Sequence, residues 1–207
     1  MQIYLIEGKL EYRLPFMNNL SKDLSKDKRC LLISFKRNTS LNLEDIYDME
    51  GMITYDICDH FLNYVSLENV INKADKNIDF IIAPLLEDKY EIKKDDINKL
   101  IEDLSCYDYL IFDNLAKNMI ENKKTITIVS DEDINKKIDA DYFFIEAEDG
   151  FDERIVRNEI LEKSSKFLGV KRKNEDYIDI INNLKDDKKA DIEKLSFIEK
   201  IKMKFKK

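Results

Sequence analysis

Six short apolar runs constrain the fold of this 207-residue chain more than any other feature. Several of them are continuous rather than alternating, as is typical of strands that are covered on both faces of a sheet. Amphipathic, helix-permissive stretches separate the runs. Strands that alternate with helices predict an α/β fold with a mostly parallel sheet flanked by helices. The predicted strands are residues 2–6, 30–35, 79–85, 107–113, 125–130 and 141–147.

The stretches between the predicted strands carry helix signals. A helix over residues 15–26 would have Pro15 in its first turn, where a proline is tolerated. Residues 54–74 are expected to hold two helices separated near Ser66, a residue type suited to an N-cap. Apolar residues at helical spacing mark one face of a helix over residues 93–105.

The charge of the chain is unevenly distributed. The formal net charge is −8, which disfavours nucleic acid as the main partner. Residues 197–207 contain five lysines and one glutamate, so this segment carries +4 and the rest of the chain −12. The three cysteines are far apart and match no zinc spacing, so we expect a reducing, cytoplasmic setting and no bound metal. No apolar run approaches the roughly 18 residues that a membrane-spanning helix needs.

The stretch after the first predicted strand is the main candidate for a ligand site. In a parallel sheet, ligands bind beyond the carboxyl ends of the strands, and residues 7–14 form the loop expected there. Many nucleotide-binding proteins have a glycine-rich phosphate loop at this place. The sequence "EGKLEYRL" instead has one glycine, Gly8, followed by Lys9 and bulky residues.

The first 116 residues resemble the MinD/ParA group of deviant Walker ATPases, and the MinD branch most closely. The segment "GKLEYRLPFMNNL" (residues 8–20) aligns without a gap with the group's GKGGVGKTT loop and the helix after it. Residues 28–51 resemble its second strand and aspartate-rich switch. Residues 53–71 resemble the Tyr-Asp and Ser-Leu segment typical of MinD, and residues 107–117 the Walker B strand. The resemblance implies a P-loop NTPase-like, three-layer α/β sandwich.

The resemblance also suggests how the chain is divided. Residues 1–172 would form the MinD-like domain, although the match after residue 116 is poor. Residues 173–195 are interpreted as a charged helix, over residues 175–184, followed by a tether. Residues 196–207 would form an amphipathic helix at the position where MinD carries its membrane-targeting helix.

The departures from the family concern the groups that bind and hydrolyse ATP. A phosphate loop turns successive backbone N–H groups toward one anion, which requires glycine at positions of positive φ. Leu10 to Arg13 replace the family's glycines, and Leu14 replaces its phosphate-binding lysine. Pro15 stands at the position of the magnesium-binding hydroxyl, and Phe35 and Arg37 stand at those of the two switch aspartates. Because phosphoryl transfer depends on positioning and electrostatics, ATP hydrolysis is not expected.

Gly8, Lys9 and Asp113 are the candidate nucleotide-binding residues, because they keep the family's groups. The resemblance implies that Lys9 would reach the nucleotide of a dimer partner and that Asp113 would hold a water of the metal. The alternatives are that Lys9 is an ordinary solvated lysine and that Asp113 caps the turn after its strand. We expect no cofactor, and ATP with magnesium only if the chain is a divergent ATPase.

The last residues, "LSFIEKIKMKFKK", have the pattern of an amphipathic helix that Ser196 can cap. The apolar side chains fall within an arc of about 100°, with Met203 as an exception on the polar side. Such a helix suits an anionic bilayer surface, and two copies in a dimer would gain by avidity. The alternatives are docking on the acidic body and nucleic-acid binding. The predicted membrane-binding residues are Phe197, Ile198, Ile201, Phe205, Lys200, Lys202, Lys204, Lys206 and Lys207.

The leading hypothesis is a MinD-like pseudo-ATPase, a cytoplasmic protein peripheral to the inner face of the cell membrane that acts by binding and not by catalysis. The resemblance implies spatial organisation, such as division-site placement or polar assembly. Its expected partners are an anionic membrane surface and either a second copy or a MinD-type ATPase. The alternatives are a divergent MinD/ParA-type ATPase that uses Lys9 and Asp113, and an adaptor of pilus or secretion assembly.

Overall fold

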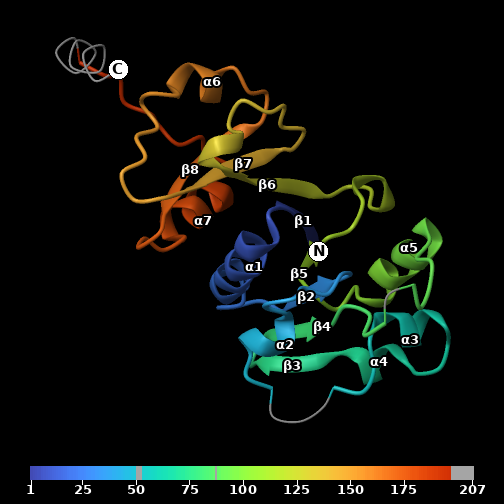
Figure 1. Cartoon of the computed structure of the whole chain (residues 1–207). Helices are drawn as coiled ribbons and strands as arrows, with labels where there is room; N and C mark the ends of the chain where they lie inside the picture. The colour runs from blue at the N-terminus through green and yellow to red at the C-terminus, as the bar shows by residue number, and fades with distance from the viewer. Residues whose placement is uncertain (50–52, 87, 197–207) are drawn as a thin grey trace. The chain divides into compact units, whose positions relative to one another are not determined.

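The computed structural model describes residues 1–49, 53–86 and 88–196, and it divides the chain into two compact units. Unit 1 comprises Met1–Ile126 and unit 2 comprises Thr127–Lys207 (Figure 1). Each unit is an arrangement of helices against a sheet. Across the described residues, every helix falls short of the length and apolar character that a membrane-crossing segment needs.

The sheet of unit 1 has the strand order β3-β4-β2-β5-β1. β2 pairs in parallel with both β4 and β5, and β5 pairs in parallel with β1. β3, the edge strand, pairs with β4 in the antiparallel sense. The strands are β1 (Gln2–Gly8), β2 (Cys30–Ser34), β3 (Asn72–Asp75), β4 (Ile78–Ile81), β5 (Tyr109–Asp113) and β6 (Lys124–Ser130), which ends in unit 2.

Helices cover both faces of this sheet and give unit 1 its three layers. α1 packs along β1, β2 and β5 on one face. Residues from α3 and α5 bury their apolar sides against the opposite face. The helices of unit 1 are α1 (Leu10–Leu24), α2 (Leu43–Ile46), α3 (Ile57–Phe61), α4 (Leu67–Val70) and α5 (Lys94–Asp103), with a short 3₁₀ turn at Lys117–Met119.

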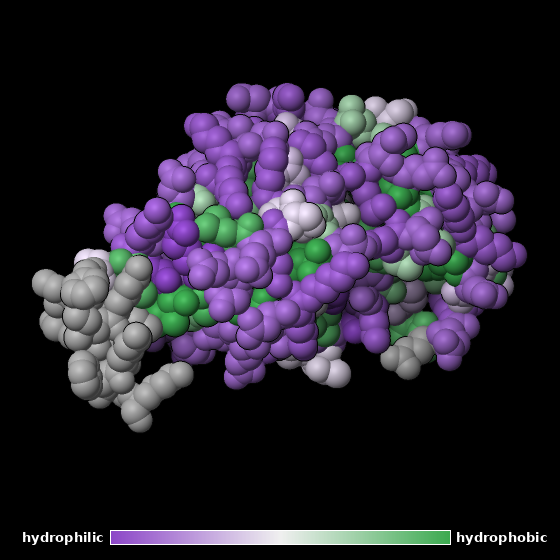
Figure 2. All heavy atoms as spheres, turned by 90° about the horizontal axis from the view of Figure 1, so that it is seen from above, coloured by the Kyte–Doolittle hydropathy of each residue, from purple (hydrophilic) through white to green (hydrophobic). Residues whose placement is uncertain are grey.

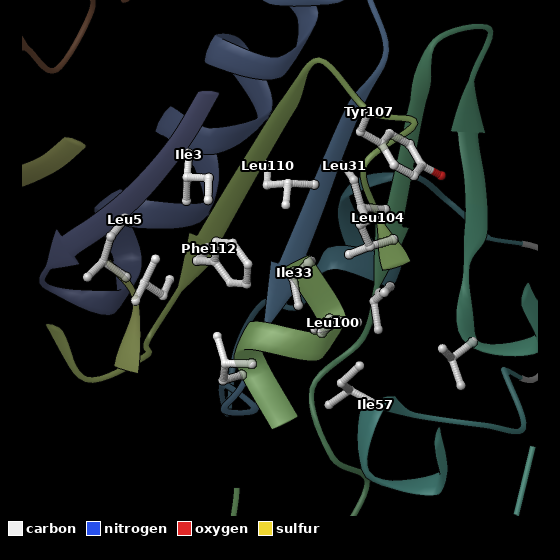
Figure 3. Close-up of a cluster of buried hydrophobic side chains, with 14 of the residues drawn as sticks. Ile3, Leu5, Leu31, Ile33, Ile57, Leu100, Leu104, Tyr107, Leu110 and Phe112 are labelled. Carbon is white, nitrogen blue, oxygen red and sulfur yellow. The ribbon is translucent and has the colours of Figure 1, made fainter. Parts of the chain in front are cut away.

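The core of unit 1 lies between the sheet and α5 (Figure 3). Alternate residues of β1, β2 and β5 point to this face because successive side chains of a strand lie on opposite sides. They meet Leu100 of α5 and Leu104 just after it, and burial of each such side chain contributes about 1.5–3 kcal/mol. The strand residues are Ile3, Leu5, Leu31, Ile33, Leu110 and Phe112.

In unit 2 the strand order is β6-β7-β8, and β7 and β8 pair in parallel. Phe143 on β7 lies on the face that packs with Ile160 of α6. Its neighbour Phe144 points to the other face and meets Tyr177, which precedes α7, edge to face. The elements are β7 (Tyr142–Ala147), α6 (Arg157–Leu161), β8 (Lys166–Arg172) and α7 (Ile178–Lys185), with a 3₁₀ turn at Asp131–Asp133.

The predicted α/β fold with a mostly parallel sheet is confirmed, and all six predicted strands are present. The two helices expected around Ser66 are α3 and α4, and the predicted helix over residues 175–184 is α7. β3 and β8 were not predicted. β3 reads "NKAD" and has no apolar run, and β8 carries lysines and Gly169 within its apolar residues. The domain boundary expected at residue 172 stays a prediction, and residues 197–207 lie outside the described part.

The predicted start of the first helix is wrong. α1 begins at Leu10, so Pro15 is its sixth residue and not part of its first turn. Leucine, glutamate, tyrosine and arginine all adopt helical backbone angles, and Glu11 in the first turn suits the positive end of the helix dipole. The expected loop over residues 7–14 therefore does not exist. Its place is taken by the end of β1, one connecting residue and the first turns of α1.

Candidate functional site

The carboxyl ends of β1, β2 and β5 lie side by side in unit 1, and this edge holds the predicted site residues. Ile6 pairs with Asp113, so Gly8 extends two residues beyond the last paired position of β1. Gly8 has a φ of +127°, a conformation that favours glycine. Lys9 directly precedes α1, and its side chain is exposed.

Arg13 of α1 contacts Asp113 at the end of β5. The guanidinium Nε lies 2.9 Å from the carboxylate Oδ1, and the side chains are 8% and 1% exposed. The two atoms do not meet hydrogen-bond geometry, so charge rather than a well-aligned hydrogen bond holds the pair. Ser34 at the end of β2 donates its hydroxyl to Asp113 Oδ2 at 3.0 Å. One buried carboxylate thus connects α1, β5 and β2.

Burial dominates the ionisation of Asp113. Its pKa is raised above the ordinary value because the carboxylate is removed from water. The charge of Arg13 and the hydrogen bond from Ser34 both lower the pKa, but they do not fully offset the effect of burial. The ion pair is therefore a compensation for a buried charge and not a large net source of stability.

The residues at this edge do not fit the triphosphate and magnesium ion that the family binds. The backbone of Leu10–Arg13 is helical, so it cannot form the wide turn in which a phosphate loop directs its N–H groups at one anion. Leu14 is buried at the position of the family's phosphate-binding lysine. The Asp113 carboxylate already has a cationic partner, so Arg13 occupies the electrostatic position that a metal ion would need.

The positions of the family's switch aspartates also have structural roles in unit 1. Phe35 stacks on Phe112 with ring centroids 6.0 Å apart. It is partly buried and packs against the edge of the hydrophobic core. Arg37 forms an ion pair with Glu44 of α2. Neither side chain supplies the carboxylate that the family has at these positions.

A second group of charges lies near the ends of β2 and β4. Lys89 Nζ is 2.8 Å from Asp56 Oδ2 and 2.7 Å from Asp59 Oδ1. Asp56 is fully buried, and it also accepts hydrogen bonds from the backbone N–H groups of Cys58 and Leu85. This carboxylate joins the start of α3 to the chain after β4.

The ionisation of this second group follows from the same contacts. Burial tends to lower the pKa of Lys89, but the hydrogen bonds to Asp56 and Asp59 raise it above the ordinary value. Burial tends to raise the pKa of Asp59, but Lys89 and the backbone N–H of Asp56 hold it below the ordinary range. Lys89 and Asp59 are therefore charged at neutral pH, which suits a fixed structural support.

A cleft of about 420 Å³ opens between these two groups of charges. Its wall includes Phe35, Lys89 and Tyr90, and at one end Asn114. Asn114 Oδ1 is also 3.4 Å from Arg13 Nη1, so the cleft reaches the Arg13–Asp113 pair. The basic residues of the cleft are Lys36, Arg37 and Lys89. Together with Asp88 and the carboxylates that pair with Arg37 and Lys89, they give no excess of positive charge, so the cleft does not have the charge of a phosphate site.

Reading the sequence identified Gly8, Lys9 and Asp113 but missed the partners that define the site. Arg13 was recognised only as a residue standing where the family has glycine. Its contact with Asp113 depends on α1 beginning at Leu10, because only then does the fourth helical residue face β5. The run Leu-Glu-Tyr-Arg is compatible with a helix but does not require one, so the local sequence gives no signal for this contact.

Comparison with known proteins agrees with the fold. No protein-family model and no curated protein sequence matches this chain. The solved structures that are similar in fold include three with identities of 20%, 18% and 14%. The first is a plasmid partition protein from Borrelia burgdorferi, with a TM-score of 0.66 over 90% of this chain and 98% of that chain.

The other two structures belong to cell-division proteins. A chain of the MinC:MinD complex from Aquifex aeolicus gives a TM-score of 0.63, covering 88% of this chain and 86% of its own. The septum site-determining protein MinD from Pyrococcus horikoshii, complexed with Mg-ADP, gives 0.65, with coverages of 84% and 82%. At these identities the likeness shows the fold. This chain has the fold of the MinD and ParA ATPases, as its sequence resemblance implied.

Removal of the Arg13 side chain should destabilise the fold. We expect Arg13→Ala to lower the free energy of unfolding by about 3–5 kcal/mol, because Asp113 would be left as an unpaired buried charge. The double variant Arg13→Met, Asp113→Leu removes both charges and should lose much less. Urea denaturation at neutral pH measures both. Lys94→Ala, which removes an exposed pair with Glu121, is the control and should change little. Equal losses for the single and double variants would contradict this account.

The raised pKa of Asp113 predicts a pH dependence with a definite sign. The proton is bound more tightly in the folded state, so this group's stabilisation is complete below its unfolded pKa of about 3.9. It is lost as the pH rises through the higher folded pKa. We compare the free energy of unfolding of the wild type with that of Asp113→Asn by urea denaturation at a series of pH values. The difference, wild type minus variant, should fall as the pH is raised from about 4. A difference that grows with pH would show that Asp113 is stabilised in its ionised form.

Proposed function

We propose that this protein is a MinD-like pseudo-ATPase, a peripheral membrane protein that contributes to spatial organisation in the cell without hydrolysing nucleotide. The observation that carries the proposal is the ion pair between Arg13 and Asp113. In a protein of this fold that binds ATP, the carboxylate after the fifth strand must be available to the metal and its water. Here a side chain of the same polypeptide neutralises it.

The helical start of α1 supports the same conclusion. An active phosphate loop has several glycines between strand and helix, whereas here Lys9 is the single residue between β1 and α1. Binding a triphosphate in the family's manner would require unwinding the first turns of α1 and breaking the Arg13 contact. The free energy for that change would have to come from contacts with the ligand. Few of the side chains that bind triphosphate in the family are present to make such contacts.

The proposed membrane attachment comes from the sequence of residues 196–207. Phe197, Ile198, Ile201 and Phe205 fall on one side of a helical projection, with lysines around them. Each lysine near an anionic leaflet contributes about 1 kcal/mol, which ordering of a short helix offsets in part. Reversible binding follows, and it would strengthen in an assembly with two such segments.

The biological role is proposed from the fold and the solved structures that share it. Those structures include a plasmid partition protein and proteins of division-site selection. A chain that keeps this framework without its nucleotide chemistry is suited to act as a binding partner in such a system. We propose a cytoplasmic protein at the inner face of the membrane, paired with a second copy or with a MinD-type ATPase.

Calorimetric titration with Mg-ATP tests the loss of nucleotide binding. We expect no saturable heat signal and no phosphate release above background, because the Asp113 carboxylate is held by Arg13 and the loop is helical. Lys9→Ala is the matched variant, since a divergent ATPase that used this lysine would lose affinity with it. Tight, magnesium-dependent binding that Lys9→Ala weakens would instead establish the divergent ATPase.

Sedimentation with lipid vesicles tests the proposed anchor. Full-length protein should pellet with vesicles that contain phosphatidylglycerol and stay in solution with neutral vesicles, because its terminal lysines need anionic lipid. A protein ending at residue 195 should stay in solution with both. Equal recovery of the two proteins in the anionic pellet would remove residues 196–207 from the proposed function.

A further inference from the structure

Near the end of the described chain, residues 190–192 run beside α6 in unit 2. Arg157 Nε of α6 donates a hydrogen bond to the carbonyl of Ile192 at 3.2 Å. The backbone N–H of Ala190 bonds to Phe167 O of β8 at 2.8 Å, and both Ala190 and Ile192 pack on the core that contains Ile160. The segment is therefore fixed to unit 2 up to Ile192, four residues before the predicted amphipathic segment begins at Ser196.

The outer side of α6 exposes two large apolar side chains. Ile155, just before the helix, is 53% exposed, and Leu161, its last residue, is 40% exposed. Ile155 lies in the turn that leads into α6, and the exposed Asn158 of α6 and Leu161 are spaced i, i+3, which places these two on one side of the helix. Seen from above, apolar side chains emerge at several places on an otherwise hydrophilic surface (Figure 2).

We propose that Ile155, in the turn before α6, and Leu161, at the end of α6, form a second membrane contact that inserts into the anionic bilayer bound by residues 196–207. This inference rests on the proposed membrane attachment of the terminal segment. The two contacts together would fix the orientation of unit 2 on the lipid surface. A flexible tether alone would leave that orientation open.

The short connection between Ile192 and the terminal segment keeps α6 near any membrane that this segment binds. The five steps from Ile192 to Phe197 span at most roughly 17 Å when fully extended. An amphipathic helix lies about 5–10 Å deep at the boundary of headgroups and acyl chains. Once the terminal segment is bound, α6 is held within about a helix length of the bilayer surface, where its exposed isoleucine and leucine reach the interface.

The charges near α6 permit shallow insertion. Arg154 is paired with Asp152, and Arg172 with Glu153, so these groups neutralise one another. The side chains of residues 151–166 include four basic and four acidic groups, which gives no net repulsion from an anionic surface. The face would contribute apolar burial, while the terminal lysines supply the electrostatic attraction.

Vesicle binding of the full-length chain tests the contact. The double variant Ile155→Ser, Leu161→Ser should bind vesicles of mixed phosphatidylcholine and phosphatidylglycerol about tenfold more weakly, because two apolar side chains lose their burial in lipid. The control is Ile178→Ser, which removes an equally exposed isoleucine from α7, and it should bind like the wild type. Circular dichroism confirms that each variant is folded.

An environment-sensitive fluorophore gives a second measurement. It would be attached to Leu161→Cys in a Cys106→Ser background, where the remaining Cys30 and Cys58 are buried and have raised thiol pKa values. Its emission should shift to the blue on anionic vesicles, and the same label at Ile178→Cys should not respond.

The possible results separate this inference from the proposed function. A wild type that binds, a double variant that binds equally well and a label at position 161 that stays in water would overturn the second contact and leave the terminal anchor intact. A wild type that binds no anionic vesicle would overturn the anchor and, with it, the contact of α6.

Discussion

The buried carboxylate of Asp113 is the constraint on which the candidate site depends. A charge with 1% of its side chain exposed requires a partner, and in this chain the partner is Arg13. That contact requires α1 to begin at Leu10, because a longer loop would leave Arg13 outside the helix and away from β5. The helical start in turn removes the backbone conformation that a phosphate needs. The helical start of α1 and the ion pair are thus two aspects of one structural feature.

This dependence also explains what the sequence could and could not reveal. Most strands of unit 1 were predictable because runs such as "CLLIS" are almost entirely apolar. A continuous apolar run of this length is typical of a strand that is buried on both faces. The start of α1 was not, because Leu10–Arg13 fit a loop or a helix equally well, and Pro15 favoured a later start. What decides between them is the contact with Asp113, about 100 residues away in sequence. Local pattern carries no record of such a pairing.

Unit 2 shows the same limit in its edge strand. β8 contains Gly169 with a φ of +133° between apolar residues, and its register with β7 shifts at that point. An alternating or continuous apolar pattern is thereby broken, so the strand is hard to recognise. The irregularity has a structural consequence: Ala190, whose N–H bonds to Phe167 O, packs close to Gly169. Gly169 thus breaks the apolar pattern by which β8 could be predicted, and it also leaves room for Ala190, in the segment that leads to the predicted amphipathic helix.

An ion pair of this kind is seldom retained for stability alone, because desolvation of both charges offsets most of their attraction. Its effect on geometry is more definite. Arg13 holds α1 to β5, and Ser34 holds β2 to the same carboxylate. In a nucleotide switch, those elements are brought together by a ligand that comes and goes, and their arrangement changes with it. Here the joining group is part of the chain, so the arrangement needs no ligand to form. Under the proposed function, a framework joined in this way would present constant surfaces to a membrane or a partner, and regulation would act through those surfaces.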